Sequence, residues 1–164
     1  MRGSKKQDGA NGTDFPQGSL LSSLINSSAP IAYSCRVSGD CGMIAVTENV
    51  HAQFGYVPEE FLADPGFWAL RIHPADSVRV FDEIQGLFER GEETMEYRFR
   101  HADGRYVWLR DEMRLKLDAS GVPDRILGRW TDVTGLKLAA ASAAHFVSGK
   151  GTDETKGEDY AKQT

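Results

Sequence analysis

The chain of 164 residues lacks several features that mark particular classes of protein. Its longest apolar runs fall well short of the ~20 residues needed to span a bilayer. The formal net charge is −5, so there is no surplus of positive charge for a nucleic-acid or anionic-membrane surface. No two histidines or cysteines have the spacing of metal ligands. We therefore expect no membrane span, no nucleic-acid partner and no metal site.

Catalytic signatures are missing as well. No serine, threonine or cysteine nucleophile comes with a base at a recognisable spacing, and no glycine-rich phosphate loop is present. We expect the chain not to be an enzyme.

Cysteines are scarce, with only Cys35 and Cys41 in the chain. The first residues, MRGSKKQDGANG, carry positive charge with no apolar segment behind it, so they do not form a secretory signal. We expect a cytoplasmic protein, in which both thiols stay reduced.

The two ends of the chain differ in composition from its middle. Residues 1–18 and 148–164 are polar, contain little to bury and are expected to be disordered tails. Directly after the first tail, SLLSSLINSS predicts a short amphipathic helix with Ser19 as its N-cap. Its apolar stripe consists of Leu20, Leu21, Leu24 and Ile25.

The middle of the chain begins with two strands and three helices. IAYSCRV and GMIAVT read as strands joined by a hairpin turn at 38–40. Short helices are expected over 49–54 and from Pro58 onward. A long helix is expected over 74–90. The apolar stripe that we expect to face the core consists of Val78, Phe81, Ile84, Leu87 and Phe88.

After this helix the apolar period changes from 3.6 to 2, which indicates strands. Met95, Tyr97 and Phe99 alternate with charged residues, and Val107 to Leu117 continues the alternation after the turn HADG. A last strand is expected over 126–133, after the turn DASG. Five antiparallel strands with helices on one face make an α+β domain.

The order of these segments resembles a PAS domain of the PAS/PAC type, a sensory module of signalling proteins. The resemblance lies in GYVPEEF, FWALRIHPADSVRVFDEI, MEYRFRHADGRYVWLRDEMRL and RILGRWTDVTGLK, and it covers roughly residues 19–138, most of the chain. It implies the PAS fold, with the strand order 2-1-5-4-3. It also implies a sensory domain over 19–134, with an N-terminal cap helix, and a linker or signalling helix over 135–147.

The D-V-T motif at residues 132–134 matches the exit of that family. The resemblance implies that this exit is the hinge between the sensory domain and its output helix. Asp132 or Thr134 could cap the helix that follows.

The resemblance also bears on flavin. Light-sensing members carry a reactive cysteine before the long helix, and here Trp68 takes its place. The amide side chains that hold their flavin correspond to Phe99, Leu109 and Trp130, which cannot make those hydrogen bonds. A flavin photoadduct is therefore excluded.

Haem-binding members usually supply a histidine from the long helix. Residues 75–90 contain no histidine. His73 lies just before them and is expected to set the start of the helix rather than to bind a metal. We therefore expect no haem.

Asp111 is an unusual residue by its position, because strand alternation points it inward between Leu109 and Met113. A buried carboxylate costs several kcal/mol unless it is paired or hydrogen-bonded. One explanation is an internal partner, with Arg71 or His73 in reach, or a bulge that turns Asp111 outward. The alternative is that Asp111 recognises a polar or cationic ligand.

Several large side chains are expected to meet between the helices and the sheet. They either fill this space or line a pocket for a ligand smaller than haem or flavin. The candidate pocket residues are Phe67, Trp68, Phe81, Tyr97, Phe99, Leu109, Asp111, Met113 and Trp130.

The opposite face of the sheet is expected to carry Trp108 together with several arginines: Arg98, Arg110 and Arg129. Exposed aromatic and arginine side chains together are typical of an interface. The stripe Leu20, Leu21, Leu24 and Ile25 could cover this face in the same subunit or in a partner, and we expect a homodimer. Cation–π packing within one subunit is the alternative.

We therefore predict a sensory or regulatory domain that binds a small ligand or a partner. The change would pass through its C-terminal helix to an output domain or a partner protein. Two alternatives remain: a ligand-free homodimerisation module, and a gas or redox sensor that uses haem at His73 or the two thiols.

Overall fold

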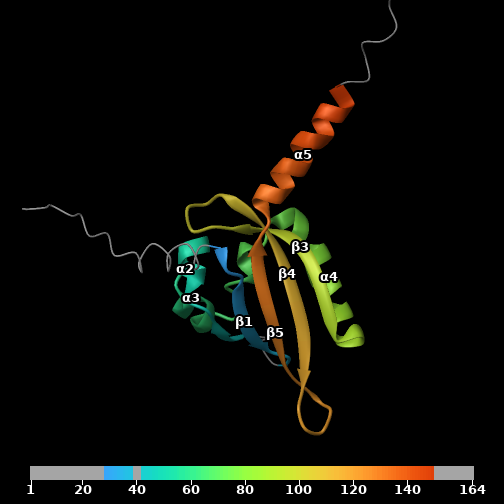
Figure 1. The fold of residues 1–164 in the computed structure, drawn as a ribbon. Coiled ribbons are helices and arrows are strands. Elements are labelled where there is room, and N and C mark those ends of the chain that lie inside the picture. Colours follow the sequence, from blue (N-terminus) through green and yellow to red (C-terminus); the bar gives the residue numbers. More distant parts are fainter. Residues whose placement is uncertain (1–27, 39–41, 150–164) are drawn as a thin grey trace, which may run out of the picture.

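The protein folds around one five-stranded antiparallel sheet, in the order β2-β1-β5-β4-β3 (Figure 1). The structure, a computed structural model, describes residues 28–38 and 42–149. The strands are β1 (Ile31–Arg36), β2 (Met43–Val46), β3 (Glu92–Arg100), β4 (Tyr106–Leu117) and β5 (Pro123–Asp132). The predicted fold class and strand order are confirmed.

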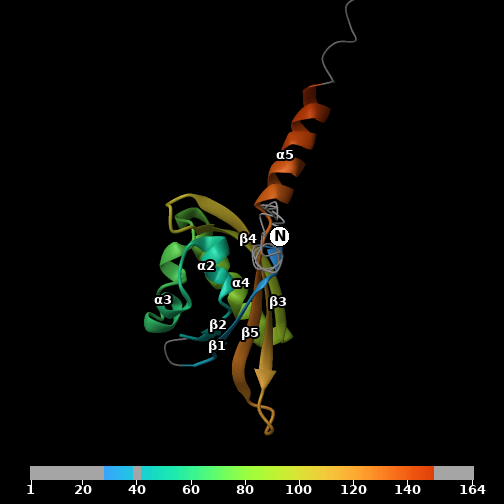
Figure 2. The ribbon, with the colours of Figure 1, turned by 60° about the vertical axis from the view of Figure 1, so that its left-hand side comes forward.

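Helices cover one face of the sheet, and one helix leaves it. The covering elements are α2 (Asn49–Phe54), α3 (Pro58–Ala63), the 3-10 turn η1 (Ala69–Arg71) and α4 (Pro74–Arg90). The last helix, α5 (Thr134–Gly149), projects away from the end of β5 (Figures 1 and 2). The stripe Leu20, Leu21, Leu24 and Ile25 of the predicted N-terminal helix lies outside the described residues. So do the two predicted tails, except residues 148 and 149, which are the last two residues of α5. No helix of the described part is long and apolar enough to cross a membrane.

Local sequence signals explain where the helices begin and end. Gly55 ends α2 and Gly91 ends α4, both with φ near +80°, a conformation that glycine adopts without strain. Pro58 and Pro74 occupy the first turns of α3 and α4. The Nδ1 atom of His73 accepts a hydrogen bond from the backbone N–H of Ala75 (3.1 Å), so the predicted role of His73 at the start of α4 is confirmed.

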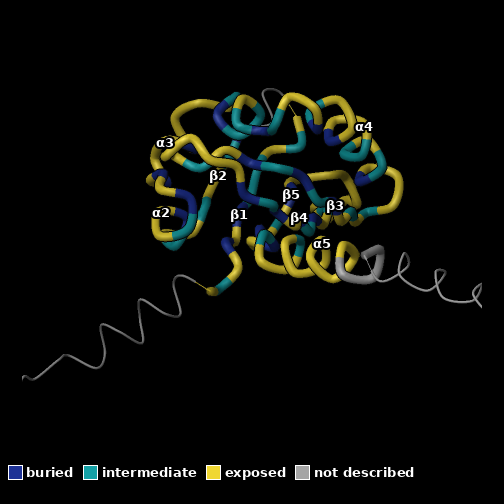
Figure 3. The backbone as a smooth tube through the Cα atoms, turned by 90° about the horizontal axis from the view of Figure 1, so that it is seen from above, coloured by how far each residue is buried: buried dark blue, intermediate teal, exposed yellow. Residues whose placement is uncertain are grey.

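The core lies between the sheet and the covering helices. The buried side chains alternate along the strands as expected, with Met95, Tyr97 and Phe99 on β3 each at most 3% exposed. Fully burying a side chain such as Phe99 stabilises the fold by roughly 1.5–3 kcal/mol. In the tube coloured by burial, dark-blue stretches lie on the strands and on the covering helices, whereas residues 135–145 of α5 are mostly exposed (Figure 3).

The buried face of α4 differs from the prediction. Leu87 is buried as expected and Ile84 is partly buried, but Val80 and Asp76 complete the buried face. Three residues of the predicted stripe are exposed: Val78 (74%), Phe81 (43%) and Phe88 (43%). Phe81, expected in the pocket, therefore lies at the rim of the core.

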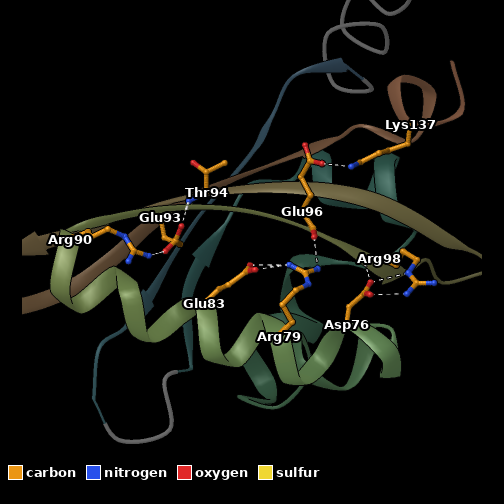
Figure 4. A network of polar contacts seen from close by, with 9 residues as sticks. All are labelled: Asp76, Arg79, Glu83, Arg90, Glu93, Thr94, Glu96, Arg98 and Lys137. Carbon is orange, nitrogen blue, oxygen red and sulfur yellow. Dashed lines mark hydrogen bonds and ion pairs between the residues drawn. The ribbon is translucent and has the colours of Figure 1, made fainter. Parts of the chain in front are cut away.

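An ion pair at the start of α4 explains why Asp76 and Val80, rather than Val78 and Phe81, face the core. The carboxylate of Asp76 accepts hydrogen bonds from the backbone N–H of Arg98 (2.9 Å) and from its guanidinium (2.7 and 2.9 Å) (Figure 4). These bonds hold the Asp76 side of the helix against the edge strand β3. The pKa of Asp76 is correspondingly lowered to about 2, chiefly by the Arg98 hydrogen bonds.

Candidate functional site

A buried carboxylate lies at the centre of the covered face of the sheet. Asp111 on β4 is 1% exposed and points inward, as the strand alternation predicted. It accepts hydrogen bonds from the hydroxyl groups of Tyr33 on β1 (2.7 Å) and Tyr97 on β3 (2.9 Å). One side chain therefore joins three strands.

The contact with Tyr33 crosses the intervening strand β5, and a glycine makes it possible. Tyr33 pairs in register with Gly128 on β5. A Cβ atom at Gly128 would lie 2.1–2.4 Å from atoms of the Tyr33 side chain. Because Gly128 lacks this atom, the ring of Tyr33 can pass over β5 and its hydroxyl reaches Asp111. The same ring stacks on Trp130, with 4.4 Å between the two ring centroids.

The hydrogen bonds continue from Asp111 to the rim of the core. The indole N–H of Trp68, which precedes η1, donates to the hydroxyl of Tyr97 (2.9 Å). Trp68 is only partly buried, and its ring packs edge-to-face with that of Phe81, with 6.0 Å between the ring centroids. A continuous path thus runs from the rim through Tyr97 to the centre of the sheet. We call Tyr33, Trp68, Tyr97 and Asp111 the interior cluster.

Burial dominates the electrostatics of the interior cluster. It raises the pKa of Asp111 from 3.8 to about 6, although the hydroxyl groups of Tyr33 and Tyr97 and the nearby indole N–H of Trp130 favour the charged form. The pKa values of Tyr33 and Tyr97 are raised well above 10, first by burial and then by the charge of Asp111. At neutral pH the carboxylate is therefore mostly charged and both hydroxyls keep their protons.

Asp111 has internal partners, as one of the predicted explanations required, but they are neither Arg71 nor His73. Arg71 instead lies over the rings of Phe67 (3.1 Å from Cζ to the centroid) and Tyr56 (4.7 Å), and it donates to the backbone oxygen of Phe67. His73 caps α4, and its ring contacts Tyr106. The alternative of a bulge that turns Asp111 outward is also wrong, because the β4 register is regular at this residue.

The predicted pocket residues come together, with Trp68 and Phe81 at the rim. At most 7% of each of the others is exposed, namely Phe67, Tyr97, Phe99, Leu109, Asp111, Met113 and Trp130. The indole N–H of Trp130 is buried and has no hydrogen-bond partner in the described part of the chain.

Sequence reasoning missed several rings of this space, among them Tyr33, Tyr56 and two phenylalanines on short helices. Phe61 on α3 lies 5.7 Å from Trp130 and 4.7 Å from Phe67, and Phe54 on α2 lies 5.4 Å from Phe99. Both stand at the inward positions of short helices, and that was the available signal. Both phenylalanine rings belong to the buried core.

The exit residues have separate roles. The side chain of Asp132 accepts from the backbone N–H of Thr134 (2.8 Å), the first residue of α5. The hydroxyl of Thr134 accepts from the backbone N–H of Trp108 on β4 (2.9 Å). Thus Asp132 supports the start of the helix, while Thr134 attaches this start to the sheet.

The face of the sheet opposite the helices carries paired charges. Trp108 is half-buried, with Lys137 of α5 at 4.9 Å and Arg98 at 5.5 Å from its ring. The expected arginines have carboxylate partners within the chain: Arg98 with Asp76, Arg110 with Glu96, and Arg129 with Glu112. Cation–π packing within one subunit thus accounts for part of the predicted interface composition.

Among the described residues, no three His, Cys, Asp or Glu side chains form a group that could hold a metal ion. Cys35 is partly buried on β1, and Cys41 lies outside the described residues.

Comparison with known proteins gives one sequence family. The family model described as the PAS fold matches residues 43–129. Over 76 residues the chain is 38% identical to the two-component sensor PprA of Pseudomonas aeruginosa. That match covers 46% of this chain and 8% of the length of PprA, so the chain corresponds to a small part of that sensor.

Solved structures give the same fold. The N-terminal domain of a diguanylate cyclase with PAS/PAC sensor from Marinobacter aquaeolei is 25% identical, with a TM-score of 0.58, over 64% of this chain and 95% of that domain. A sensory box histidine kinase/response regulator from Burkholderia thailandensis is 20% identical, with a TM-score of 0.61, over 79% and 95%. At 20% identity the second likeness concerns the fold alone.

Proposed function

The chain belongs to the PAS-fold family, and from this premise we propose that it is a sensory and regulatory module of a signalling protein. Two relatives support the proposal, since one is a two-component sensor and the other a diguanylate cyclase with a PAS/PAC sensor. In both, the similar segment is part of a longer protein. This fits a module that passes its signal to an output domain or a partner.

The observation that carries the proposal is the interior cluster around Asp111. Trp130 is the register neighbour of Asp111 on β5 and lies two residues before Asp132. A ligand or partner that changes the hydrogen bonds of this carboxylate would repack Trp130 and shift the end of β5. The start of α5 would shift with it, as a change in population between two packings.

The interior suits a small polar ligand better than a large cofactor. Phe99, Leu109 and Trp130 occupy the positions that would have to hydrogen-bond a flavin, and their side chains pack in the core. The helix α4 has no histidine for haem. We propose a module without flavin, haem or catalytic activity, whose ligand bonds to Asp111.

Native mass spectrometry of the purified chain tests this function, because it reports bound mass and oligomeric state together. We expect a discrete added mass, lost in Asp111→Asn and kept in Asp124→Asn, a matched change at an exposed carboxylate. The same added mass in both variants, or none in the wild type, would contradict ligand binding at Asp111.

A second candidate function is a ligand-free homodimerisation module. It is favoured by the exposed apolar residues of the projecting helix α5, where Leu136 is 66% and Leu138 is 64% exposed. Sedimentation of wild type and Trp108→Arg at micromolar concentration tests the interface predicted from the sequence. If Trp108→Arg still forms the dimer, Trp108 is not part of the dimer interface. A monomer with a bound ligand removes this candidate.

The thiol-based sensor and the cytoplasmic location stay predictions. The thiol version predicts that Cys35→Ser/Cys41→Ser no longer responds to oxidant. An unchanged response in this double variant would remove it.

A further inference from the structure

The helix α4 carries a second apolar stripe, beside its buried face. Val78, Phe81 and Phe88 follow one another at spacings of three and seven residues, so they lie on one side of the helix. Between 43% and 74% of each is exposed. Phe81 touches Trp68, so the stripe borders the rim of the core. Contiguous exposed apolar residues of this kind mark interaction surfaces.

Free negative charge flanks this stripe. Asp82 and Glu89 are seven residues apart and exposed, and neither has an ion-pair partner in the parts of the chain that the structure describes. A shallow groove beside the stripe is lined by Val78, by the acidic residues Asp82, Glu83 and Glu89, and by Arg79, Gln85 and Arg90. Apolar and acidic side chains therefore share one surface.

The two cations that also line this groove, Arg79 and Arg90, already have partners within the chain. Arg79 pairs with Glu83 (3.0 Å) and donates to the backbone oxygen of Glu96 on β3 (2.8 Å). Arg90 pairs with Glu93 at the start of β3. Figure 4 shows the contacts of Arg79 with Glu96 and of Arg90 with Glu93 running from the helix to the strand. The charge left for a partner is that of Asp82 and Glu89.

We propose that the stripe Val78, Phe81 and Phe88, with Asp82 and Glu89 beside it, is a docking surface for an amphipathic helix of a partner protein. The partner helix has lysine or arginine residues next to its apolar face. An amphipathic helix that lies along α4 can place its apolar face on this stripe and its charged residues beside Asp82 and Glu89. A neutral or acidic partner would desolvate the two carboxylates without compensation, whereas a basic one pairs with them.

This surface goes beyond the proposed function, which needs only the interior cluster. The two are adjacent, because Phe81 packs on Trp68 and Trp68 donates to Tyr97. Docking on Phe81 changes the surroundings of the Trp68 ring. The indole N–H of Trp68 is therefore a reporter of occupancy.

The test uses two synthetic helical peptides with the same leucine stripe, one with lysine and one with glutamate on its polar face. Each is titrated into the ¹⁵N-labelled full chain and followed by NMR. We expect the lysine peptide to shift the amide signals of Val78, Asp82 and Glu89 and the indole signal of Trp68. Its affinity should exceed that of the glutamate peptide by about tenfold or more.

Two variants and a control locate the binding. Binding of the lysine peptide should become about tenfold weaker in Phe81→Ser and, separately, in the double variant Asp82→Asn/Glu89→Gln. Leu136→Ser removes an apolar residue of α5 that is more exposed than Phe81, and it should leave the affinity unchanged.

Several results would overturn the proposal. The first is equal affinity for both peptides, and the second is no change in the NMR signals at millimolar peptide. The third is signal changes elsewhere in the chain that are the same in Phe81→Ser. Self-association of the chain through the same residues would assign the surface to a second copy instead. None of these outcomes changes the added mass that tests ligand binding at Asp111, so the two proposals fail separately.

Discussion

Asp111 is buried against hydroxyl groups rather than against a cation. Two tyrosine hydroxyls supply hydrogen bonds but no opposite charge, so burial outweighs them and the pKa rises to about 6. The charge of this residue therefore depends on small changes in its surroundings. A group with this property suits a sensor, because a ligand or a proton changes the same hydrogen bonds.

Removing the carboxylate of Asp111 should remove one contribution to the pH dependence of stability. Since the pKa of Asp111 is raised from 3.8 to about 6, its contribution to stability is full below pH 3.8 and is lost as pH rises through 6. The difference in unfolding free energy, wild type minus Asp111→Asn, should fall by about 2 kcal/mol between pH 4 and 7.5.

Urea denaturation of both proteins at several pH values measures this difference. The contribution of Asp76, whose pKa is lowered, runs in the opposite direction and cancels because both proteins contain it. Asp124→Asn is the control at an exposed carboxylate. A difference that does not vary with pH would show that Asp111 has an ordinary pKa.

Gly128→Ala should destabilise the fold by about 1–3 kcal/mol, as overpacking does. The added Cβ would lie 2.1–2.4 Å from the Tyr33 side chain, which must move away and give up its bond to Asp111. In a Tyr33→Ala background the same change should have little effect. Denaturation midpoints of the four proteins give the coupling, and additive effects would contradict it. Gly135→Ala, with open space around its Cβ, is the control.

At this scale the sequence predicted where Asp111 points but not what it binds. Strand alternation alone places it inward. Its partner Tyr33 lies two strands away in the sheet and reaches it only because Gly128 has no side chain. Such a contact depends on strand order and on a missing Cβ atom together. Arg71 was expected because of its charge, yet its guanidinium lies on the aromatic rings.

At the scale of elements, the bounds of α4 were predictable and its orientation was not. Pro74 and Gly91 mark its ends in the sequence. Its apolar residues cover more of the circumference than the core can bury, so the periodicity does not determine which part faces inward. The tertiary pair of Asp76 with Arg98 makes that choice and leaves Phe81 outside.

The attachment of α5 should weaken when its two polar contacts are removed. Asp132→Ala takes away the acceptor for the Thr134 N–H, and Thr134→Val takes away the acceptor for the Trp108 N–H. Each loss corresponds to about 1 kcal/mol, so these amides and the first turn of α5 should exchange hydrogen about fivefold faster.

Hydrogen–deuterium exchange by NMR measures this effect residue by residue. Ser142→Ala removes a hydrogen bond in the middle of α5 and should leave the first turn unchanged. Unchanged protection in both variants would show that packing, rather than Asp132 and Thr134, holds the start of the helix.

At the scale of the whole molecule, the interior cluster connects places that the chain order separates. The path starts at Trp68 before α4, passes Tyr97 and Asp111, and ends beside Trp130 on the strand that leads into α5. The family resemblance predicted the fold and its exit. The path itself rests on side-chain contacts between four different segments, and no local pattern in the sequence specifies those.

The most direct test of this account is a pH titration of the ¹³C,¹⁵N-labelled chain by NMR. It follows the carboxyl carbon of Asp111 together with the backbone amides of Asp132, Thr134 and Lys137. We predict one common midpoint near pH 6 for all four signals, and flat amide signals in Asp111→Asn. Two results would show that the charge of Asp111 does not affect α5. One is a titration of the carboxyl carbon while the three amide signals stay constant. The other is the same titration of the three amides in wild type and in Asp111→Asn.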